Sequence, residues 1–287
     1  MMKGRRGKIL SRLLLHTTVI FIAFLWLVPT VGVLVTSFRL AQDVANSGWW
    51  TVFENIFSQV RFTLRNYQVV LSRMGIGRAF LNSFIITIPS TVIPLGIALF
   101  AAYALAWMRF FGRTTIFMIM IALLVVPLQM TFIPILQIFN KTGLAGTFPG
   151  IWLAHAGYGL PLAIYMLHNF ISELPKELID SACIDGASLF YIFLRIILPL
   201  SVPIVASLTI FQFLWVWNDL LVALIYLGGT LDVAPVTVQI SSLVGSYGQD
   251  WELLTAAVFI SIIPSLVVFF SLQRYFVRGI LAGSIKG

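Results

Sequence analysis

The side chains that most often carry out enzyme chemistry are scarce in this chain of 287 residues. It has three histidines, His16, His155 and His168, and one cysteine, Cys183. No acidic residue falls within a helical turn of any histidine, so they show neither metal-ligand spacing nor a general acid–base pair. One cysteine alone excludes an internal disulfide and a cysteine-based metal site. We therefore predict that the chain is not an enzyme and holds no metal.

Nucleotide chemistry is also poorly supported. The sequence closest to a phosphate-binding loop is Gly4-Arg5-Arg6-Gly7-Lys8. It lacks the spacing of that motif and the Ser or Thr that follows its lysine. These basic residues lie just before the first apolar run, where they favour a membrane orientation signal. We predict that the chain binds no cofactor of its own.

The acidic side chains are concentrated in one polar segment, residues 173–188, which contains four of the ten in the chain. Its apolar residues have helical spacing, so a short amphipathic helix is predicted. They are Leu174, Leu178, Ile179 and Ala182. Pro175 suits the first turn of this helix and Gly186 a sharp turn after it. The pattern indicates a helix that docks on a partner, with Leu178, Ile179 and Ala182 as docking area. The alternative is a solvated connector.

A second group of polar side chains lies inside apolar runs. Asp219 follows Trp215, Trp217 and Asn218, and a carboxylate there is costly unless it faces the bundle interior or water. Two interpretations stay open: these residues break or pack a helix, or they line a path for a solute. Aromatic rings and amides suit sugars, because rings stack on C–H faces while amides bond hydroxyl groups. The candidate path residues are Gln129, Gln137, Gln212, Trp215, Asn218 and Asp219.

A membrane-embedded helical bundle must position these residues. Hydrophobic residues make up 60% of the chain and charged residues only 10%, against about 25% charged in soluble domains. Lipid must therefore cover much of the surface. We predict an all-α, polytopic fold with six transmembrane helices, since about 20 apolar residues span a bilayer. Prolines inside the apolar runs predict kinks. The runs are 17–38, 80–107, 115–139, 150–172, 200–227 and 255–277.

The placement of the basic residues predicts the orientation. The net charge is +8, but the basic residues lie at the ends of apolar runs, which argues against nucleic-acid binding. With both termini in the cytoplasm, twelve of the eighteen lie in inner segments. Four of the other six lie in the outer loop 39–79, whose Trp49 and Trp50 suit an interfacial anchor. The first run is too long for a signal peptide, and we expect it to remain as a helix.

The predicted division of the chain has three parts. Residues 1–79 form a cytoplasmic tail, the first membrane helix and the long outer loop. Residues 80–277 form a five-helix core that includes a cytoplasmic loop, residues 173–199. Residues 278–287 form a second cytoplasmic tail, which is too short to fold alone.

The polar segment resembles the EAA loop of ABC importer permeases. Asp180-Ser181-Ala182-x-x-Asp185-Gly186-Ala187 is followed by Ile196-x-Leu198-Pro199. Asp and Ser stand at positions 180 and 181, where that family usually has Glu and Ala. Further segments are similar to the carbohydrate branch, and within it to the maltose permease's smaller subunit. They are Asn66-Tyr67, Asn82-Ser83, Ala102-Tyr103-Ala104, Val126-Pro127, Ile133-Pro134, Trp217-Asn218-Asp219, Gln273-Arg274-Tyr275 and Gly283-Ser284-Ile285-Lys286-Gly287. Three early segments look like permeases for α-glucosides and glucosylglycerol: Trp26-Leu27-Val28-Pro29-Thr30, Thr36-Ser37-Phe38-Arg39 and Ser47-Gly48-Trp49-Trp50.

The resemblance implies a type I ABC importer permease in a bacterial-type inner membrane. Its partners would be a second homologous permease, two ATPase subunits that carry ATP and Mg, and an extracytoplasmic solute-binding protein. The solute would be a sugar or sugar-like compound, such as the α-glucosides glucosylglycerol, trehalose, sucrose or maltose. A membrane enzyme or channel that works alone is the alternative, and co-purification of an ATPase would distinguish the two.

The resemblance also implies roles for particular residues. Ser284 and Lys286 in the tail would reach the ATPase interface. The outer segment 228–253, which we expect to be polar and irregular, either contacts the binding protein or is a plain loop. The residues that would couple this chain to an ATPase are Glu177, Asp180, Ser181, Ala182, Asp185, Gly186 and Ala187.

Overall fold

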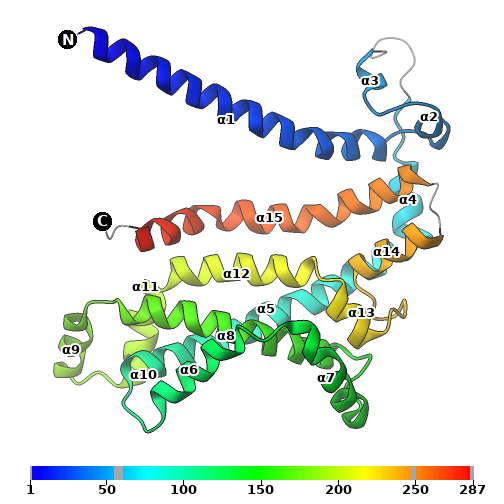
Figure 1. Cartoon of the computed structure of the whole chain (residues 1–287). Coiled ribbons are helices and arrows are strands. Elements are labelled where there is room, and N and C mark those ends of the chain that lie inside the picture. The colour runs from blue at the N-terminus through cyan, green and yellow to red at the C-terminus, as the bar shows by residue number, and fades with distance from the viewer. Residues whose placement is uncertain (1, 55–60, 247–249, 285–287) are drawn as a thin grey trace. The chain divides into compact units, whose positions relative to one another are not determined.

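The chain folds into helices (Figure 1). The computed structural model describes the backbone of residues 2–54, 61–246 and 250–284, and the side chains of residues 11–54, 61–244 and 250–275. No strand occurs among these residues, apart from one isolated bridge between Arg39 and Phe62. In lipid, backbone N–H and C=O groups must be hydrogen-bonded within the protein, and helices meet this requirement on their own. The all-α prediction is confirmed.

Four helices are long and apolar enough to cross a membrane on their own. They are α1 (Met2–Ser37), α5 (Ile76–Trp107), α8 (Phe148–Ser172) and α15 (Trp251–Ser284). Two further spans arise only if a bent helix pair counts as one crossing, which brings the number to six. The number of predicted spans is thus reached, while the cytoplasmic placement of both termini stays a prediction.

The first bent pair corrects the prediction of one continuous span over residues 115–139. Helices α6 (Arg113–Leu123) and α7 (Leu128–Thr142) meet at 104°. The break falls just before Pro127, whose φ of −61° and ψ of 124° make it the residue that precedes α7. Proline disfavours helical geometry in the residue before it, which suits a break at Val126, although Pro134 lies inside α7 without a break. The proline-induced kink is therefore a full break.

The second bent pair changes the bounds of the fifth predicted span, residues 200–227. Residues Leu189–Leu200 and helix α12 (Val202–Trp217) meet at 71°. The first arm consists of α10 (Leu189–Ile192), the π-helix η1 (Phe193–Ile197) and α11 (Leu198–Leu200). Helix α12 ends at Trp217, and the rest of the predicted run forms a separate helix, α13 (Leu221–Leu227).

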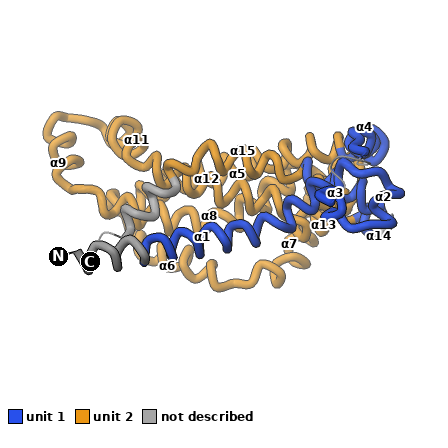
Figure 2. The backbone as a smooth tube through the Cα atoms, turned by 90° about the horizontal axis from the view of Figure 1, so that it is seen from above, with its two compact units in different colours: residues 1–76, 242–260 blue, residues 77–241, 261–287 orange. Residues whose placement is uncertain are grey.

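The chain divides into two compact units, which Figure 2 colours separately. Unit 1 contains residues 1–76 and 242–260, and unit 2 contains residues 77–241 and 261–287. Helices α14 (Val236–Ser246) and α15 each begin in one unit and end in the other. The functional division predicted at residues 79 and 277 stays a prediction.

Unit 1 gathers segments that the resemblance singled out separately. It contains α2 (Ala41–Asn46), α3 (Thr51–Glu54) and α4 (Arg65–Ser72). Arg39 is buried, and its guanidinium donates to the carbonyl oxygens of Asp43 and Ser47 at 2.8 and 3.0 Å. Asn66 on α4 donates to the carbonyl oxygens of Ser37 and Arg39 at 2.9 and 2.8 Å. A buried charge needs such partners, so these bonds hold the loop that follows α1 in one conformation.

Unit 2 holds two clusters of buried apolar side chains. The first, here the α9-end cluster, draws on α5, α8, α10, η1 and α12, and on α9 (Lys176–Ile184). The second, here the α13-end cluster, draws on α5, α7, α8, α12, α13, the segment before α14 and the first turn of α14. Figure 1 shows α9 and α10 at one end of this unit and α7 and α13 at the other. Helices α5, α8 and α12 run between the two ends.

Candidate functional site

Helix α9 lies where the polar segment predicted an amphipathic helix. Pro175 precedes it, and Gly186 follows it with a φ of +78°. The N–H of Gly186 donates to the Cys183 carbonyl at 3.1 Å, and the N–H of Ala187 donates to the Ala182 carbonyl at 2.9 Å. These two bonds form a Schellman motif, whose left-handed residue is usually glycine. The predicted sharp turn at Gly186 is confirmed.

The apolar side of α9 faces the protein's own core. Ile179 is 6% exposed, and Leu174, Ala182 and Ala187 pack against the α9-end cluster. The prediction that Ile179 forms docking area for a partner is therefore wrong, because that side chain is buried, whereas for the half-buried Ala182 it stays a prediction. A helical face that needs burial can find it within the same chain, and periodicity alone does not distinguish the two cases.

The rest of α9 is exposed. Leu178, on the same face as Ala182 but 45% exposed, lies at the edge of the core-facing side, and Ile184 is 86% exposed. Lys176 and Asp180 form an ion pair at 3.7 Å, with 72% and 57% of their side chains exposed. The candidate coupling residues therefore separate into two groups, because Ala182 and Ala187 are half-buried while the others are exposed. The exposed ones are Glu177, Asp180, Ser181, Asp185 and Gly186.

The chain returns from α9 through α10 and the π-helix. Ser188 accepts a hydrogen bond from the N–H of Tyr191 at 3.2 Å, which caps the start of α10. The N–H of Leu198 then bonds to the carbonyl of Phe193, five residues back, and this wider turn directly precedes Pro199. Pro199 has no N–H and would crowd the carbonyl four residues before it, so the wider turn suits this position. The Ile196-x-Leu198-Pro199 motif thus marks a local irregularity between the loop and α12.

The two candidate residues of the C-terminal tail lie largely outside the described part of the chain. Ser284 is the last residue of α15, but its side chain lies outside the described residues, as does the whole of Lys286. Their predicted contact with an ATPase stays a prediction.

Two cavities lie beside α8 and α12, with volumes of about 500 and 520 Å³. They share Leu124, Tyr158 and Trp215 in their lining, and Gln212 lines the larger one. The structure therefore brings together two of the predicted path residues, Gln212 and Trp215. Gln129, Gln137 and Asn218 are exposed but line neither of these cavities.

Tyr158 is a cavity residue that the sequence did not distinguish from the other tyrosines. Its hydroxyl group lies 2.8 Å from the hydroxyl of Thr131 and 2.8 Å from that of Tyr226. Three hydroxyl groups on α7, α8 and α13 thus form one chain of hydrogen bonds. Partners this far apart in sequence leave no local pattern, and only the fold joins them.

Asp219 lies at the break between α12 and α13. Its carboxylate accepts hydrogen bonds from the N–H groups of Val222 and Ala223 at 3.3 and 2.9 Å, which caps the start of α13. Asn218 donates back to the Leu214 carbonyl at 2.8 Å, and Trp217 is 1% exposed and packs against Phe80 and Phe84. This geometry fits the helix-breaking and packing interpretation, while a place for Asn218 and Asp219 on a solute path stays a prediction.

A histidine accompanies this break. His155 on α8 is 1% exposed, and its Nε2 lies 3.8 Å from a carboxylate oxygen of Asp219. Neither ring nitrogen is hydrogen-bonded within the described part of the chain. The indole of Trp215 packs edge-on against the imidazole with ring centroids 5.8 Å apart. Local spacing had assigned His155 no acidic neighbour, because the one it has comes from another helix.

The segment after α13 is tied to the start of α5 and is not wholly irregular as expected, because α14 begins within it at Val236. Asn82 donates to the carbonyl oxygens of Asp232 and Ala234, both at 3.1 Å. Ser83 accepts from the N–H of Val236 at 2.8 Å. Arg78 and Asp232 form an exposed ion pair at 2.9 Å. The Asn82-Ser83 segment therefore anchors residues 232–236.

Comparison with known proteins identifies this arrangement. A family model described as "Binding-protein-dependent transport system inner membrane component" matches residues 93–282. The chain is similar to the osmoprotective compounds uptake permease protein GgtD of Synechocystis, with 58% identity over 99% of this chain and 95% of that one. It is similar to the alpha-glucoside transport system permease protein AglG of Rhizobium meliloti, with 55% identity over 88% of this chain and 68% of that one.

A solved structure shares the fold. It is a crystal structure of a bacterial ABC transporter involved in the import of the acidic polysaccharide alginate. One of its chains matches with a TM-score of 0.75 and 20% identity over 96% of this chain and 98% of that chain. The likeness extends over nearly the whole length of both chains.

Proposed function

This chain belongs to the family of binding-protein-dependent transport system inner membrane components, and from that premise we propose that α9 couples it to a separate ATPase subunit. The chain is a multi-pass inner-membrane permease of an ABC importer for a sugar, a transport subunit without its own ATP site. Because hydrolysis takes place in another protein, its free energy must reach the solute path mechanically. The coupling element must therefore be stiff, exposed on one side and anchored on the other.

The two-sided burial of α9 is the observation that carries this proposal. Ile179 anchors one side in the core at 6% exposure, while Ile184 on the other side is 86% exposed. A Schellman turn ends the helix at Gly186, and the exposed side carries both apolar and acidic groups. A groove on an ATPase would cover Leu178 and Ile184, and the acidic groups would set the register of docking.

Charge reversal at Asp180 tests the proposal. Asp180→Lys places two lysines one helical turn apart and reverses the charge offered to the partner. We expect a purified complex to lose bound ATPase and transport, with the permease still inserted in the membrane. Asp180→Glu is the matched control, because it keeps the charge and introduces the residue usual in this family. Normal transport by Asp180→Lys and by Ile184→Glu in an assembled complex would exclude α9 as the coupling site.

We propose four kinds of partner. They are a second homologous permease, two ATPase subunits that hold ATP and Mg, an extracytoplasmic solute-binding protein, and the sugar-like solute itself. Dependence on a binding protein is part of the family description. Residues 232–236, which Asn82 and Ser83 anchor, are the proposed contact with the binding protein, because Arg78 and Asp232 expose charged groups there. In the tail, Ser284 and Lys286 are proposed to reach the ATPase interface.

The proposed solute is an α-glucoside or a close analogue, such as glucosylglycerol, trehalose, sucrose or maltose. The names of two relatives support this class, one an uptake permease for osmoprotective compounds and one for alpha-glucosides. The proposed path includes Gln212 and Trp215, where an aromatic ring and an amide border a cavity of about 520 Å³. Uptake of each labelled sugar by the assembled importer would identify the solute. Uptake of none of them would reject the class.

Reporter fusions test the proposed orientation, with both termini in the cytoplasm. A reporter that works only in the cytoplasm should be active after Lys176 and after Gly287, and silent after Lys141. Activity after Lys141 would reject the cytoplasmic placement of α9.

A further inference from the structure

Two aromatic side chains on α5 contact the two ends of the α9 loop, although α5 precedes this loop by some 70 residues of chain. The indole N–H of Trp107 donates to the carbonyl of Ile171, in the last turn of α8, at 3.1 Å. The hydroxyl of Tyr103 donates to the carbonyl of Leu189, the first residue of α10, at 3.0 Å. Tyr103 and Trp107 are one helical turn apart and therefore lie on the same face of α5. One face of α5 thus bonds to both ends of the α9 loop, at Ile171 before it and at Leu189 after it.

These bonds are additional to the local backbone bonds. Ile171 O also accepts from the N–H of Leu174, and Leu189 O also accepts from the N–H of Phe193. A carbonyl oxygen has two lone pairs, so it can accept a second donor without losing the first. The helix ends would keep their local bonds without the aromatic donors. What Tyr103 and Trp107 add is a fixed position of both ends relative to α5.

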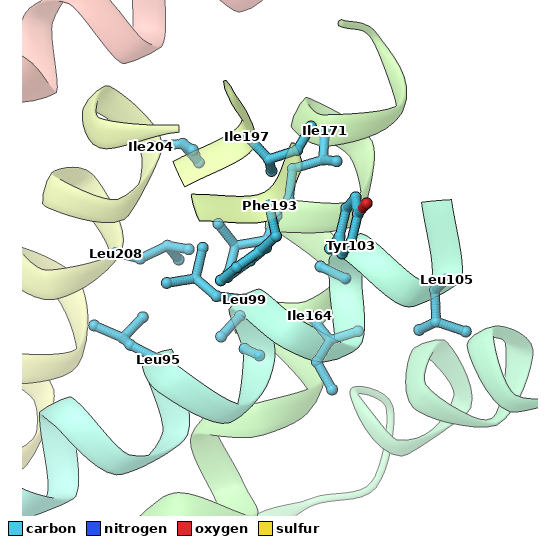
Figure 3. Packing of buried hydrophobic residues seen from close by; sticks show 14 of the residues in the cluster. Leu95, Leu99, Tyr103, Leu105, Ile164, Ile171, Phe193, Ile197, Ile204 and Leu208 are labelled. Carbon is cyan, nitrogen blue, oxygen red and sulfur yellow. The ribbon is translucent and has the colours of Figure 1, made fainter. Parts of the chain in front are cut away.

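Close packing stiffens the same contact. Figure 3 shows Tyr103, Phe193 and Ile171 in the α9-end cluster. Phe193, the first residue of the π-helix, stacks on Phe100 with ring centroids 4.6 Å apart and lies 5.4 Å from the ring of Tyr103. Tyr103 and Phe193 are each 3% exposed and Ile171 is fully buried. Close-packed side chains transmit displacement because they cannot be compressed.

The far end of α5 is fastened as well. Asn82 and Ser83 hold residues 232–236 at the other end of unit 2 by three hydrogen bonds of 2.8 to 3.1 Å. Helix α5 has 32 residues, which corresponds to about 48 Å at 1.5 Å per residue. Helix α5 is therefore bonded to both ends of the α9 loop near its own C-terminus and to residues 232–236 near its N-terminus. Helix α5 is next to neither the α9 loop nor residues 232–236 in the sequence.

We propose that Tyr103 and Trp107 are positioning residues that make α5 move with the coupling loop, so that α5 carries the loop's displacement to residues 232–236. The inference rests on the proposed coupling role of α9 and on the proposed binding-protein contact at residues 232–236. Through α5, rather than through α8 or α12, a displacement at the ATPase side would reach the side of the binding protein. In the reverse direction, the same connection lets a loaded binding protein at residues 232–236 stimulate ATP hydrolysis.

The double variant Tyr103→Phe with Trp107→Phe tests the connection in the assembled complex in proteoliposomes. Both substitutions keep an aromatic ring. Tyr103→Phe removes only the hydroxyl group, whereas Trp107→Phe removes the indole N–H together with part of the ring, a loss of volume that the control variant Trp152→Phe shares. We expect binding-protein-stimulated hydrolysis and transport to fall by about 2- to 30-fold, the range of coupling along contiguous networks. The amount of bound ATPase should not change, since the exposed side of α9 is intact. The readout is therefore the ratio of stimulated to unstimulated hydrolysis. A lower amount of permease would reduce both rates equally and leave this ratio constant.

Trp152→Phe is the matched control, because Trp152 on α8 donates to the carbonyl of Ile85 on α5 at 2.8 Å, away from the loop. It removes an indole donor between the same two helices that Trp107 joins, α5 and α8, and should leave stimulation unchanged. Stimulation in the double variant equal to that in Trp152→Phe would overturn the proposal. Loss of bound ATPase would also overturn it, by showing that the pair shapes the docking surface instead. If the double variant does not accumulate, each single variant is measured in the same way.

Two further variants separate this inference from the function it rests on. If Gly186→Leu transports normally, the coupling role of α9 fails, whatever the aromatic pair does. If Gly186→Leu is defective and the aromatic double variant is normal, only the route through α5 fails. Asn82→Ala removes two of the three hydrogen bonds at the far end of α5, so its defect should not add to that of the double variant. Additive defects would mean two independent routes and would overturn the proposal.

Discussion

The two ends of unit 2 are built by different means. At the α9 end, local turn chemistry shapes the helix, with Pro175 before it, a Schellman motif at Gly186 and a Ser188 cap on the next helix. At the α13 end, polar groups from distant helices meet, as Asp219 does with His155 and Tyr158 with Tyr226. A loop that must keep its own shape while a partner moves it needs stiffness of local origin. A region between several helices can instead be held by bonds that form only when those helices assemble.

Gly186 offers the largest expected effect at the α9 end. Its φ of +78° costs any residue with a Cβ about 1–2 kcal/mol, which corresponds to roughly 5- to 30-fold in an equilibrium. No neighbour within 4 Å would meet an added Cβ, so the cost is conformational. We expect Gly186→Ala and Gly186→Leu to reduce ATPase association and transport to a similar extent. Gly186→Asn should be milder, because asparagine tolerates this region.

Co-purification of the ATPase with each Gly186 variant measures this series. Comparable membrane levels of all three proteins are the control for insertion. A leucine variant much worse than the alanine variant would contradict a purely conformational account, because it would place a partner surface against this position.

Asp219 is the corresponding position at the α13 end. Asp219→Ala removes two bonds that cap α13, and loss of such a cap costs about 0.5–2 kcal/mol. Asp219→Asn should fall between the parent protein and the alanine variant, because its single amide oxygen can replace only one of the two carboxylate oxygens that accept these bonds. The His155 contact at 3.8 Å is too long for a hydrogen bond. Thermal unfolding of the purified permease in detergent measures the difference. Equal destabilisation by both variants would indicate that the charge of Asp219, rather than its capping, is what matters.

The contrast between the two ends also explains what could be predicted from the sequence. Gly186 and Pro127 act on neighbouring residues, so the turn and the kink were visible as patterns. The inward direction of Ile179 was missed because an apolar stripe has the same spacing whether it faces its own core or a partner. His155 and Asp219 are 64 residues apart, and only packing of α8 against the α12–α13 break joins them. The third predicted span became two helices at Pro127 but continues through Pro134, and neither hydropathy nor the presence of a proline shows which of the two breaks the helix.

A smaller effect is expected at Gln212, where the path and packing interpretations differ. Its amide donates to the Ser90 carbonyl at 3.1 Å and lies against Gly159, where an added Cβ would approach within 2.6 Å of the amide oxygen. Gln212→Met keeps the volume and removes the polar group, a loss of about 0.5–1.5 kcal/mol for one hydrogen bond. If this amide also binds the solute, the solute concentration for half-maximal uptake should rise about 2- to 12-fold.

Uptake as a function of solute concentration measures that change. Met166→Leu is the control, because Met166 lines the same cavity without a hydrogen-bond donor. A lowered maximal rate with unchanged half-saturation would assign Gln212 to helix packing. Gln212 would then act in helix packing, as Asp219 acts in helix capping, rather than in solute binding.

The smallest expected effect returns to α9 and concerns the pair formed by Lys176 and Asp180. The two charges are 3.7 Å apart and mostly exposed, so water and salt screen them and the pair contributes less than about 1 kcal/mol to folding. Asp180→Ala should therefore leave the thermal stability of the permease nearly unchanged. A charge that sets the register of docking acts across an interface instead, and its effect on ATPase association should weaken as salt is added, since the Debye length falls from about 10 Å at 0.1 M to 3 Å at 1 M. We expect Asp180→Ala to reduce association about 2- to 5-fold at low ionic strength and hardly at all near 1 M. Lys176→Ala is the matched control, because it breaks the same pair while leaving the acidic group free for a partner. An equal loss of association in both variants would mean that the pair only supports the helix, and the register of α9 would then depend on Leu178 and Ile184.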